Sequence, residues 1–217
     1  MKNVFFLFVL LFVTGALSAQ SEKYSTSMKT AVDSLQTAQT PEDFIDVANT
    51  FGRIASAEPG AWLPGYYASY ANLIAGFIAS RTDMAKGQTY IDHAQTLLQN
   101  AAPKAILPAD LSEIATLQAY IYIGKVTEDP MTKGQELSPM VFQELGKAAA
   151  MNPNNPRAPF LQGMYTLNMP EFYGGGAKNA KPFLEKAQGL FEADIQDGIR
   201  PNWGKKKNEE LLKTVAP

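Results

Sequence analysis

The chain has 217 residues, and its 19 lysine and arginine residues nearly balance 21 aspartate and glutamate residues, so the formal net charge is −2. This balance provides no basic surface for nucleic acid. The absence of cysteine excludes disulfide bonds and a lipid attached through an N-terminal cysteine.

The first element along the chain is an apolar N-terminal segment. An unbroken apolar run at residues 4–13 follows a lysine and precedes several small residues. This layout is typical of a secretory signal peptide, and the run is shorter than the roughly 20 residues of a membrane-spanning helix. We expect residues 1–19 to be a signal peptide, cleaved after Ser18 or Ala19. Residues 20–217 would then form one domain, periplasmic or secreted, without a membrane span.

Helical periodicity dominates the rest of the chain. Apolar residues recur three and four positions apart, which is typical of helices with one buried face. Thr40, Pro41 and two acidic residues form an N-cap and first turn. No credible pair of strands is present, so the predicted fold class is all-α. The expected helices cover roughly residues 22–37, 41–57, 61–79, 84–101, 109–125, 138–151, 157–168, 177–193 and 205–214.

A pattern of small and large residues recurs in the second helix of several predicted helical pairs. Small residues let neighbouring helices approach, a larger residue fills the gap, and a proline ends the helix. Copies without the proline begin at Gly87 and Ala180. The two full copies are Val47, Phe51, Ile54 and Pro59, and Val141, Leu145, Ala148 and Pro153.

This spacing resembles the end of a tetratricopeptide repeat (TPR), and small residues at Ser69, Ala119 and Gly163 suit the opening helices of such repeats. The resemblance covers residues 40–193 and implies a TPR-like α-α superhelix of about four helical hairpins plus a C-terminal helix. The whole chain, with its "PNWG" and short last helix, resembles exported TPR-like proteins of Gram-negative envelopes. Some of those accompany transporter components.

Three insertions lengthen the same turn of the predicted repeats. The distance from the small residue of each opening helix to the first residue of the closing pattern is 18, 22 and 17 residues, which is longer than in a standard repeat. Equivalent turns of a repeat array lie along one edge. We therefore expect a loop edge, to which the last insertion contributes Phe172, Tyr173 and three consecutive glycines.

The sequence offers little for catalysis or metal binding. His93 is the only histidine and lies within a predicted helix, where it is interpreted as a surface residue. The acidic stretch "TEDPMTKG" lacks the alternating oxygen ligands of a calcium loop, and "GGGAKNAK" lacks the spacing of a phosphate-binding loop. We expect no enzyme activity, catalytic residue, metal or cofactor, and we expect His93→Ala to leave binding intact.

The predicted function is therefore that of a non-catalytic binding scaffold of the cell envelope, whose partner is a protein or peptide, such as a transporter component. The alternative is a small-molecule carrier or transporter accessory subunit, with an aromatic-lined pocket enclosed by Trp62, Tyr66 and the "EFYGGG" loop. The candidate partner-binding residues of the concave groove and the loop edge are Tyr66, Tyr70, Thr116, Tyr120, Phe160, Met164, Phe172 and Tyr173.

Overall fold

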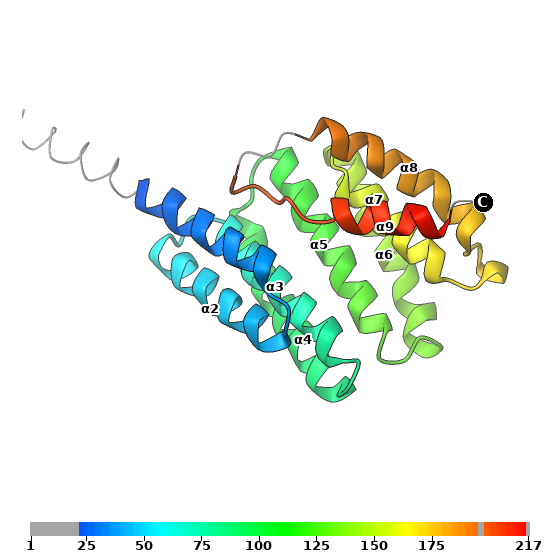
Figure 1. The fold of residues 1–217 in the computed structure, drawn as a ribbon, viewed down its shortest axis with the longest axis horizontal. Helices are drawn as coiled ribbons and strands as arrows, with labels where there is room; N and C mark the ends of the chain where they lie inside the picture. The colour runs from blue at the N-terminus through cyan, green and yellow to red at the C-terminus, as the bar shows by residue number, and fades with distance from the viewer. Residues whose placement is uncertain (1–21, 195–197, 216–217) are drawn as a thin grey trace, which may run out of the picture.

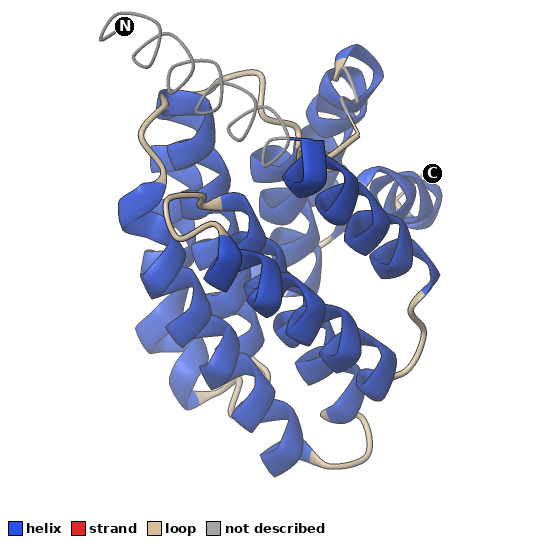
Figure 2. Cartoon of the chain, turned by 90° about the vertical axis from the view of Figure 1, so that its left-hand side faces the viewer, coloured by secondary structure: helices blue, strands red, loops and turns tan. Residues whose placement is uncertain are grey.

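A computed structural model describes residues 22–194 and 198–215, so the expected signal peptide lies outside the described residues. Within these two ranges every regular element is a helix, which confirms the all-α prediction (Figure 2). The first helix covers residues 22–37. The other elements are α2 (Pro41–Ala57), α3 (Leu63–Ala79), α4 (Met84–Ala101), η1 (Ala102–Lys104), α5 (Pro108–Val126), α6 (Thr132–Met151), α7 (Arg157–Asn168), η2 (Glu171–Tyr173), α8 (Ala177–Ala193) and α9 (Lys205–Thr214).

The start of α2 is fixed by a reciprocal cap, as its sequence indicates. The Thr40 side chain accepts a hydrogen bond from Asp43 N at 3.1 Å. The Asp43 carboxylate accepts one from Thr40 N at 2.9 Å. The cap satisfies backbone donors that the first helical turn leaves unpaired.

The start of α6 differs from the prediction by six residues, because the helix begins at Thr132 rather than at 138. Asp129 explains the difference: its Oδ1 accepts a hydrogen bond from Thr132 N, and its backbone oxygen accepts one from Lys133 N. Pro139 lies inside α6 and does not end it. The longest insertion therefore mainly extends two helices and leaves a short turn at residues 127–131.

The helices pack as antiparallel pairs placed side by side (Figure 1). The pairs are α3 with α4, α5 with α6, and α7 with α8, while α2 packs on α3. Two apolar clusters form the core, one centred on the N-terminal helices and one on the C-terminal helices. Tyr70 and Tyr120 pack against both clusters and so join the two halves.

The small residues of the repeated pattern lie where helices approach closely. Gly163 of α7 is buried against α8, and a Cβ atom there would lie 2.6 Å from Leu184 Cδ2. Leu145 and Ala187 are also buried, with 2% and 0% of their surface exposed. The helix crossings expected from the spacing are therefore tightly packed.

Two substitutions test this packing. Leu145→Ala should lower the free energy of unfolding by about 2–5 kcal/mol because it leaves a cavity. Gly163→Leu should lower it by overpacking the α7–α8 crossing. The control is Gly146→Leu, since a Cβ atom at Gly146 meets nothing within 4 Å. Urea unfolding measures all three, and unchanged midpoints for the first two would refute the packing.

The three consecutive glycines have a structural role in the loop between α7 and α8. Gly174 and Gly176 adopt φ angles of 84° and 90°, a region that side chains disfavour. Gly175 has no space for a side chain, because a Cβ atom would lie 2.0 Å from the Met169 backbone oxygen. This loop and the α3–α4 and α5–α6 turns follow one another along the lower and right-hand edge of Figure 1.

Candidate functional site

The segment that leads into α9, residues 198–204, occupies the groove predicted along α3, α5 and α7 and is called the C-terminal segment below. The Trp203 ring stacks on Tyr70 with centroids 4.9 Å apart and on Tyr120 at 5.6 Å. Phe160 meets the same indole edge-on at 6.3 Å. The structure thus brings these three predicted site residues together around a fourth ring, which was not among the candidates.

Hydrogen bonds hold this segment on the groove. Tyr66 Oη accepts a hydrogen bond from Trp203 Nε1 at 2.9 Å and donates one to Glu113 Oε2 at 3.2 Å. Tyr67 Oη donates to the Arg200 backbone oxygen at 2.7 Å. Tyr66 is fully buried, so in this conformation it can contact no partner.

The other predicted site residues are dispersed. Thr116 is fully buried and donates a hydrogen bond to the Ser112 backbone oxygen. Met164 is half-buried against the C-terminal cluster. Phe172 and Tyr173 are 80% and 59% exposed, and their rings contact each other at 4.2 Å. They form an aromatic surface pair on the loop edge, separate from the rings around Trp203.

Burial raises the pKa of the groove tyrosines. Desolvation raises the pKa of Tyr66 and Tyr70 well above the usual value of 10.0, and it raises that of Tyr120 to about 12. Burial favours the neutral phenol, so each of these tyrosines stabilises the fold because its pKa is higher in the folded state than in the unfolded state. This contribution is complete below about pH 10. For Tyr120 that stability is lost as the pH rises from about 10 to 12.

An alkaline titration should therefore show tyrosinate absorbance in two stages, with the buried tyrosines ionising at higher pH and together with loss of helical circular dichroism. Tyr120→Phe should retain more helicity between about pH 10 and 12, because it removes one group that ionises on unfolding. A single tyrosine titration near pH 10 with unchanged helicity would contradict the burial.

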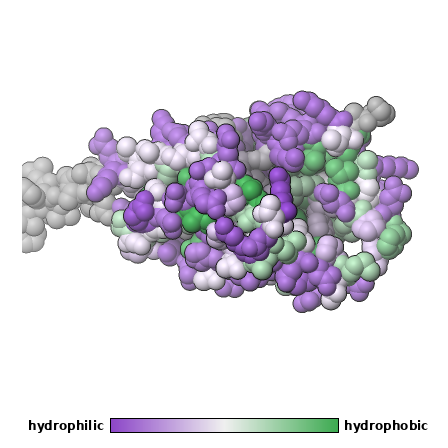
Figure 3. All heavy atoms as spheres, turned by 60° about the horizontal axis from the view of Figure 1, so that its bottom comes forward, coloured by the Kyte–Doolittle hydropathy of each residue, from purple (hydrophilic) through white to green (hydrophobic). Residues whose placement is uncertain are grey.

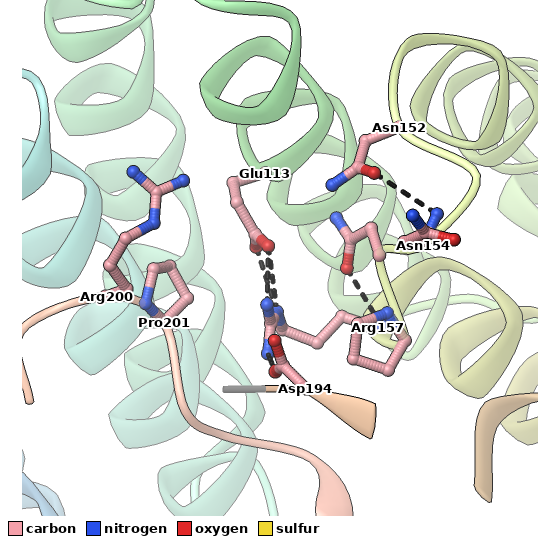
Figure 4. A pocket seen from close by; sticks show the side chains of 9 residues that line it. Glu113, Asn152, Asn154, Arg157, Asp194, Arg200 and Pro201 are labelled. Atoms are coloured by element: carbon pink, nitrogen blue, oxygen red, sulfur yellow. Dashed lines mark hydrogen bonds and ion pairs between the residues drawn. The ribbon is translucent and has the colours of Figure 1, made fainter. Parts of the chain in front are cut away.

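A small polar pocket of about 200 Å³ lies where α7 begins and the C-terminal segment passes (Figure 4). Arg157 is central to it: Nη2 lies 2.6 Å from Glu113 Oε1, and Nη1 lies 3.3 Å from Asp194 Oδ2. Burial alone would lower the pKa of Arg157, but the attraction and hydrogen bonds of Glu113, together with the charges of Tyr66 and Asp194, outweigh it, so the pKa is raised. These buried charges satisfy one another, so the pocket is best explained as part of the scaffold.

A larger groove of about 540 Å³ lies between α2 and α4, and α3 also lines it. This volume is within the range of about 300–1,000 Å³ typical of small-ligand sites. Figure 3, which brings the lower side of Figure 1 forward, shows hydrophobic residues scattered between hydrophilic ones. The groove is lined by Ile45, Ala48, Asn49, Gly52, Arg53, Ser56, Asn72, Tyr90, His93 and Leu97.

The α2 side of this groove provides space and a positive charge. Ala48 and Gly52 lie one helical turn apart, and a Cβ atom at Gly52 would meet nothing within 4 Å. Arg53 is exposed, donates a hydrogen bond to Thr50 Oγ1 at 2.9 Å, and forms no ion pair with any described residue. Its guanidinium can therefore bind a ligand carboxylate by paired hydrogen bonds.

The α4 side carries His93. This residue is exposed, as expected, but its Nδ1 lies 3.1 Å from Oδ1 of Asn72, which is buried in α3.

Sequence reasoning missed this groove because its residues come from three helices. The small residues Ala48 and Gly52 on one face of α2 were the available signal, since they leave room beside a polar helix surface.

The comparisons with known proteins give one solved structure as similar. No family model matches the sequence, and no curated protein matches it. The fold is similar to the solved structure of the HusA haemophore from Porphyromonas gingivalis, with a TM-score of 0.77 and 27% sequence identity. The similarity covers 88% of this chain and 92% of that chain, so it extends over nearly the whole fold.

Proposed function

We propose that this chain is a carrier of haem or a related porphyrin and that the groove between α2 and α4 is its binding site. The observation that carries the proposal is the similarity to a haemophore over 88% of the chain. A small-molecule carrier is the alternative that the sequence left open, but the groove is not the expected pocket, because neither Trp62, Tyr66 nor the "EFYGGG" loop lines it. The neighbour is a binding protein rather than an enzyme, which supports a non-catalytic function here.

The groove has the chemistry that a porphyrin needs. A porphyrin is a flat apolar ring system with two carboxylates on one edge. Ile45 and Leu97, on opposite sides of the groove, are half-buried and offer apolar contact to the ring. Arg53, with no acidic partner among the described residues, offers an ion pair to a carboxylate.

The proposed setting is the bacterial envelope or its exterior. No helix in the described part of the chain is long and apolar enough to cross a membrane. A carrier outside the cytoplasm would pass its ligand to a transporter component, as the expected partner suggests. The TPR-like architecture also remains a proposal, supported by the stacked helical pairs and the tight crossing at Gly163.

A groove-blocking variant tests the binding site. Gly52→Trp would place a large ring in the groove without a backbone clash, and it replaces the residue with low helix propensity. The matched control is Gly189→Trp on α8, because a Cβ atom there also meets nothing within 4 Å. Titration of haem into each protein should show at least about a tenfold loss of affinity for Gly52→Trp only, a difference of about 1.4 kcal/mol.

Equal haem affinity of Gly52→Trp, Gly189→Trp and the unchanged protein would reject the groove as the site. No saturable haem binding by the unchanged protein would reject the function itself. Circular dichroism of both variants should match that of the unchanged protein, because neither position is closely packed.

The second candidate function is a scaffold for a protein or peptide. The exposed pair Phe172 and Tyr173 favours it, since a surface aromatic pair is a common element of protein interfaces. Replacing residues 172–176 by Asn-Gly tests this candidate. Loss of partner capture from envelope extract, at unchanged melting temperature and unchanged haem affinity, would support a separate protein-binding edge.

A further inference from the structure

We infer that one end of the molecule, formed by the α7–α8 loop and the last turn of α9, docks on the surface of an anionic lipid membrane. This docking goes beyond the binding of a small molecule and uses residues outside the groove between α2 and α4. The residues that would contact lipid are called the aromatic–lysine end below and are Phe172, Tyr173, Lys178, Lys181 and Lys213.

The α7–α8 loop keeps its two aromatic rings in solvent on a well-bonded backbone. Gly175 N donates a hydrogen bond to the Pro170 backbone oxygen at 3.1 Å, and Gly176 N donates one to the Thr166 backbone oxygen at 3.0 Å. The side chain of Asn179 donates to the Gly175 backbone oxygen at 3.0 Å. A loop that is already held in one conformation loses little entropy on binding, so the rings are preorganised for contact.

The first turns of α8 supply two positive charges next to this loop. Lys178 and Lys181 follow Gly176 by two and five residues and lie one helical turn apart. Neither forms an ion pair with any residue in the described ranges. Glu171 lies against the start of α8, since a Cβ atom at Gly176 would lie 3.3 Å from its Oε1, and Glu185 lies a further turn along α8. Positive charge therefore predominates beside the rings.

The last turn of α9 adds Lys213 to the same end. α9 packs on α8 in the antiparallel direction, because a Cβ atom at Gly204 would lie 3.0 Å from Phe191, whereas Asn208 donates a hydrogen bond to the Leu184 backbone oxygen at 3.1 Å. Each further turn of α9 lies nearer the start of α8, and α9 ends beside it (Figure 1). Lys213 is exposed and has no ion pair in the described part of the chain.

This combination of residue types favours a lipid surface over a protein partner. Lysine is depleted in protein–protein interfaces, where arginine and tryptophan are preferred. On a membrane, by contrast, aromatic rings lie at the level of the headgroups, and lysine side chains extend beside them toward anionic lipid phosphates. Each lysine near the surface adds attraction to an anionic leaflet. We therefore expect reversible binding that needs both the rings and the lysines.

Another exposed apolar pair provides a matched control for the rings. Ile106 and Leu107 are 81% and 61% exposed, close to the 80% and 59% of Phe172 and Tyr173. They lie between η1 and α5, at the opposite end of the antiparallel helical pairs. The control for charge consists of three lysines that also have no ion pair with a described residue, namely Lys23, Lys29 and Lys104.

Flotation with lipid vesicles tests the inference. Vesicles of phosphatidylcholine and phosphatidylglycerol in equal parts are compared with vesicles of phosphatidylcholine alone. The exported protein is used without the expected signal peptide, whose apolar run would itself bind lipid. It should float with the anionic vesicles, and high salt should weaken this binding because it screens the lysines.

Four variants locate the contact. A loss of at least about tenfold in affinity for the anionic vesicles is expected for two of them, Phe172→Ser/Tyr173→Ser and Lys178→Gln/Lys181→Gln/Lys213→Gln. The two controls should bind the vesicles like the unchanged protein and are Ile106→Ser/Leu107→Ser and Lys23→Gln/Lys29→Gln/Lys104→Gln. Haem affinity should be unchanged in all four variants, because none of these residues lines the groove between α2 and α4.

Three outcomes would overturn the inference. The first is that the unchanged protein does not float with anionic vesicles. The second is an equal loss of vesicle affinity in the controls, which would show nonspecific attraction. The third is flotation with native envelope fragments but not with pure lipid, which would show that this end contacts a protein. Failure of the unchanged protein to bind haem would reject the proposed function and leave the lipid docking in place.

Discussion

Replacing Arg157 by methionine should lower the free energy of unfolding by about 3–5 kcal/mol, because it leaves the Glu113 carboxylate buried without its counter-charge. Arg157 and Glu113 side chains are only 5% and 4% exposed. Three nitrogen–oxygen contacts of 2.6–3.0 Å join them. Solvent therefore cannot replace the lost partner.

Urea denaturation at neutral pH measures this effect, and two comparisons make it specific. Arg53→Met removes an arginine that is exposed and has no ion pair with a described residue, so it should change stability by less than about 0.5 kcal/mol. The double variant Arg157→Met/Glu113→Leu should recover much of the loss, because apolar side chains can replace a buried ion pair. A small effect of Arg157→Met alone would mean that the pair is hydrated in solution.

Trp203→Ala should lower the free energy of unfolding by about 3–5 kcal/mol, the range found for buried aromatic residues. The indole is 8% exposed, stacks on Tyr70 and Tyr120, and donates a hydrogen bond to Tyr66. Its loss would leave a cavity in the centre of the concave side, and the Tyr66 oxygen would lose its hydrogen-bond donor while still donating to Glu113.

Trp203→Phe is the informative companion. It keeps a ring between Tyr70 and Tyr120 but loses the hydrogen bond, so it should cost clearly less than Trp203→Ala. Thermal unfolding of both variants provides the comparison. If Trp203→Ala melts like the unchanged protein, the C-terminal segment does not stay on the groove in solution, and the concave side is open to a partner.

The helices could be predicted from the sequence because their signals are local. The predicted starts of α4, α7, α8 and α9 match the structure, and the cap at Thr40 indicated that of α2. The start of α6 was missed because Gly134 and Pro139 indicate a break, whereas the cap from Asp129 and the burial of Val141 and Leu145 favour a continuous helix.

The candidate site depends on contacts between distant residues and could be predicted only in part. Tyr70, Tyr120 and Phe160 lie together around Trp203, because helical register places them on one side. Their partner Trp203 comes from a segment with no periodicity that could place it. The pairing of His93 with Asn72, 21 residues apart, depends on the crossing of α3 and α4.

The most direct test of the carrier assignment is an NMR titration of the isotope-labelled protein with iron-free protoporphyrin, which avoids paramagnetic broadening. We expect saturable chemical-shift changes concentrated on backbone amides of α2 and α4 around Ala48, Gly52 and His93. The chemical shifts of amides near Trp203 and at residues 172–176 should not change. Absence of saturable shifts, or shifts centred on the Trp203 side, would contradict it.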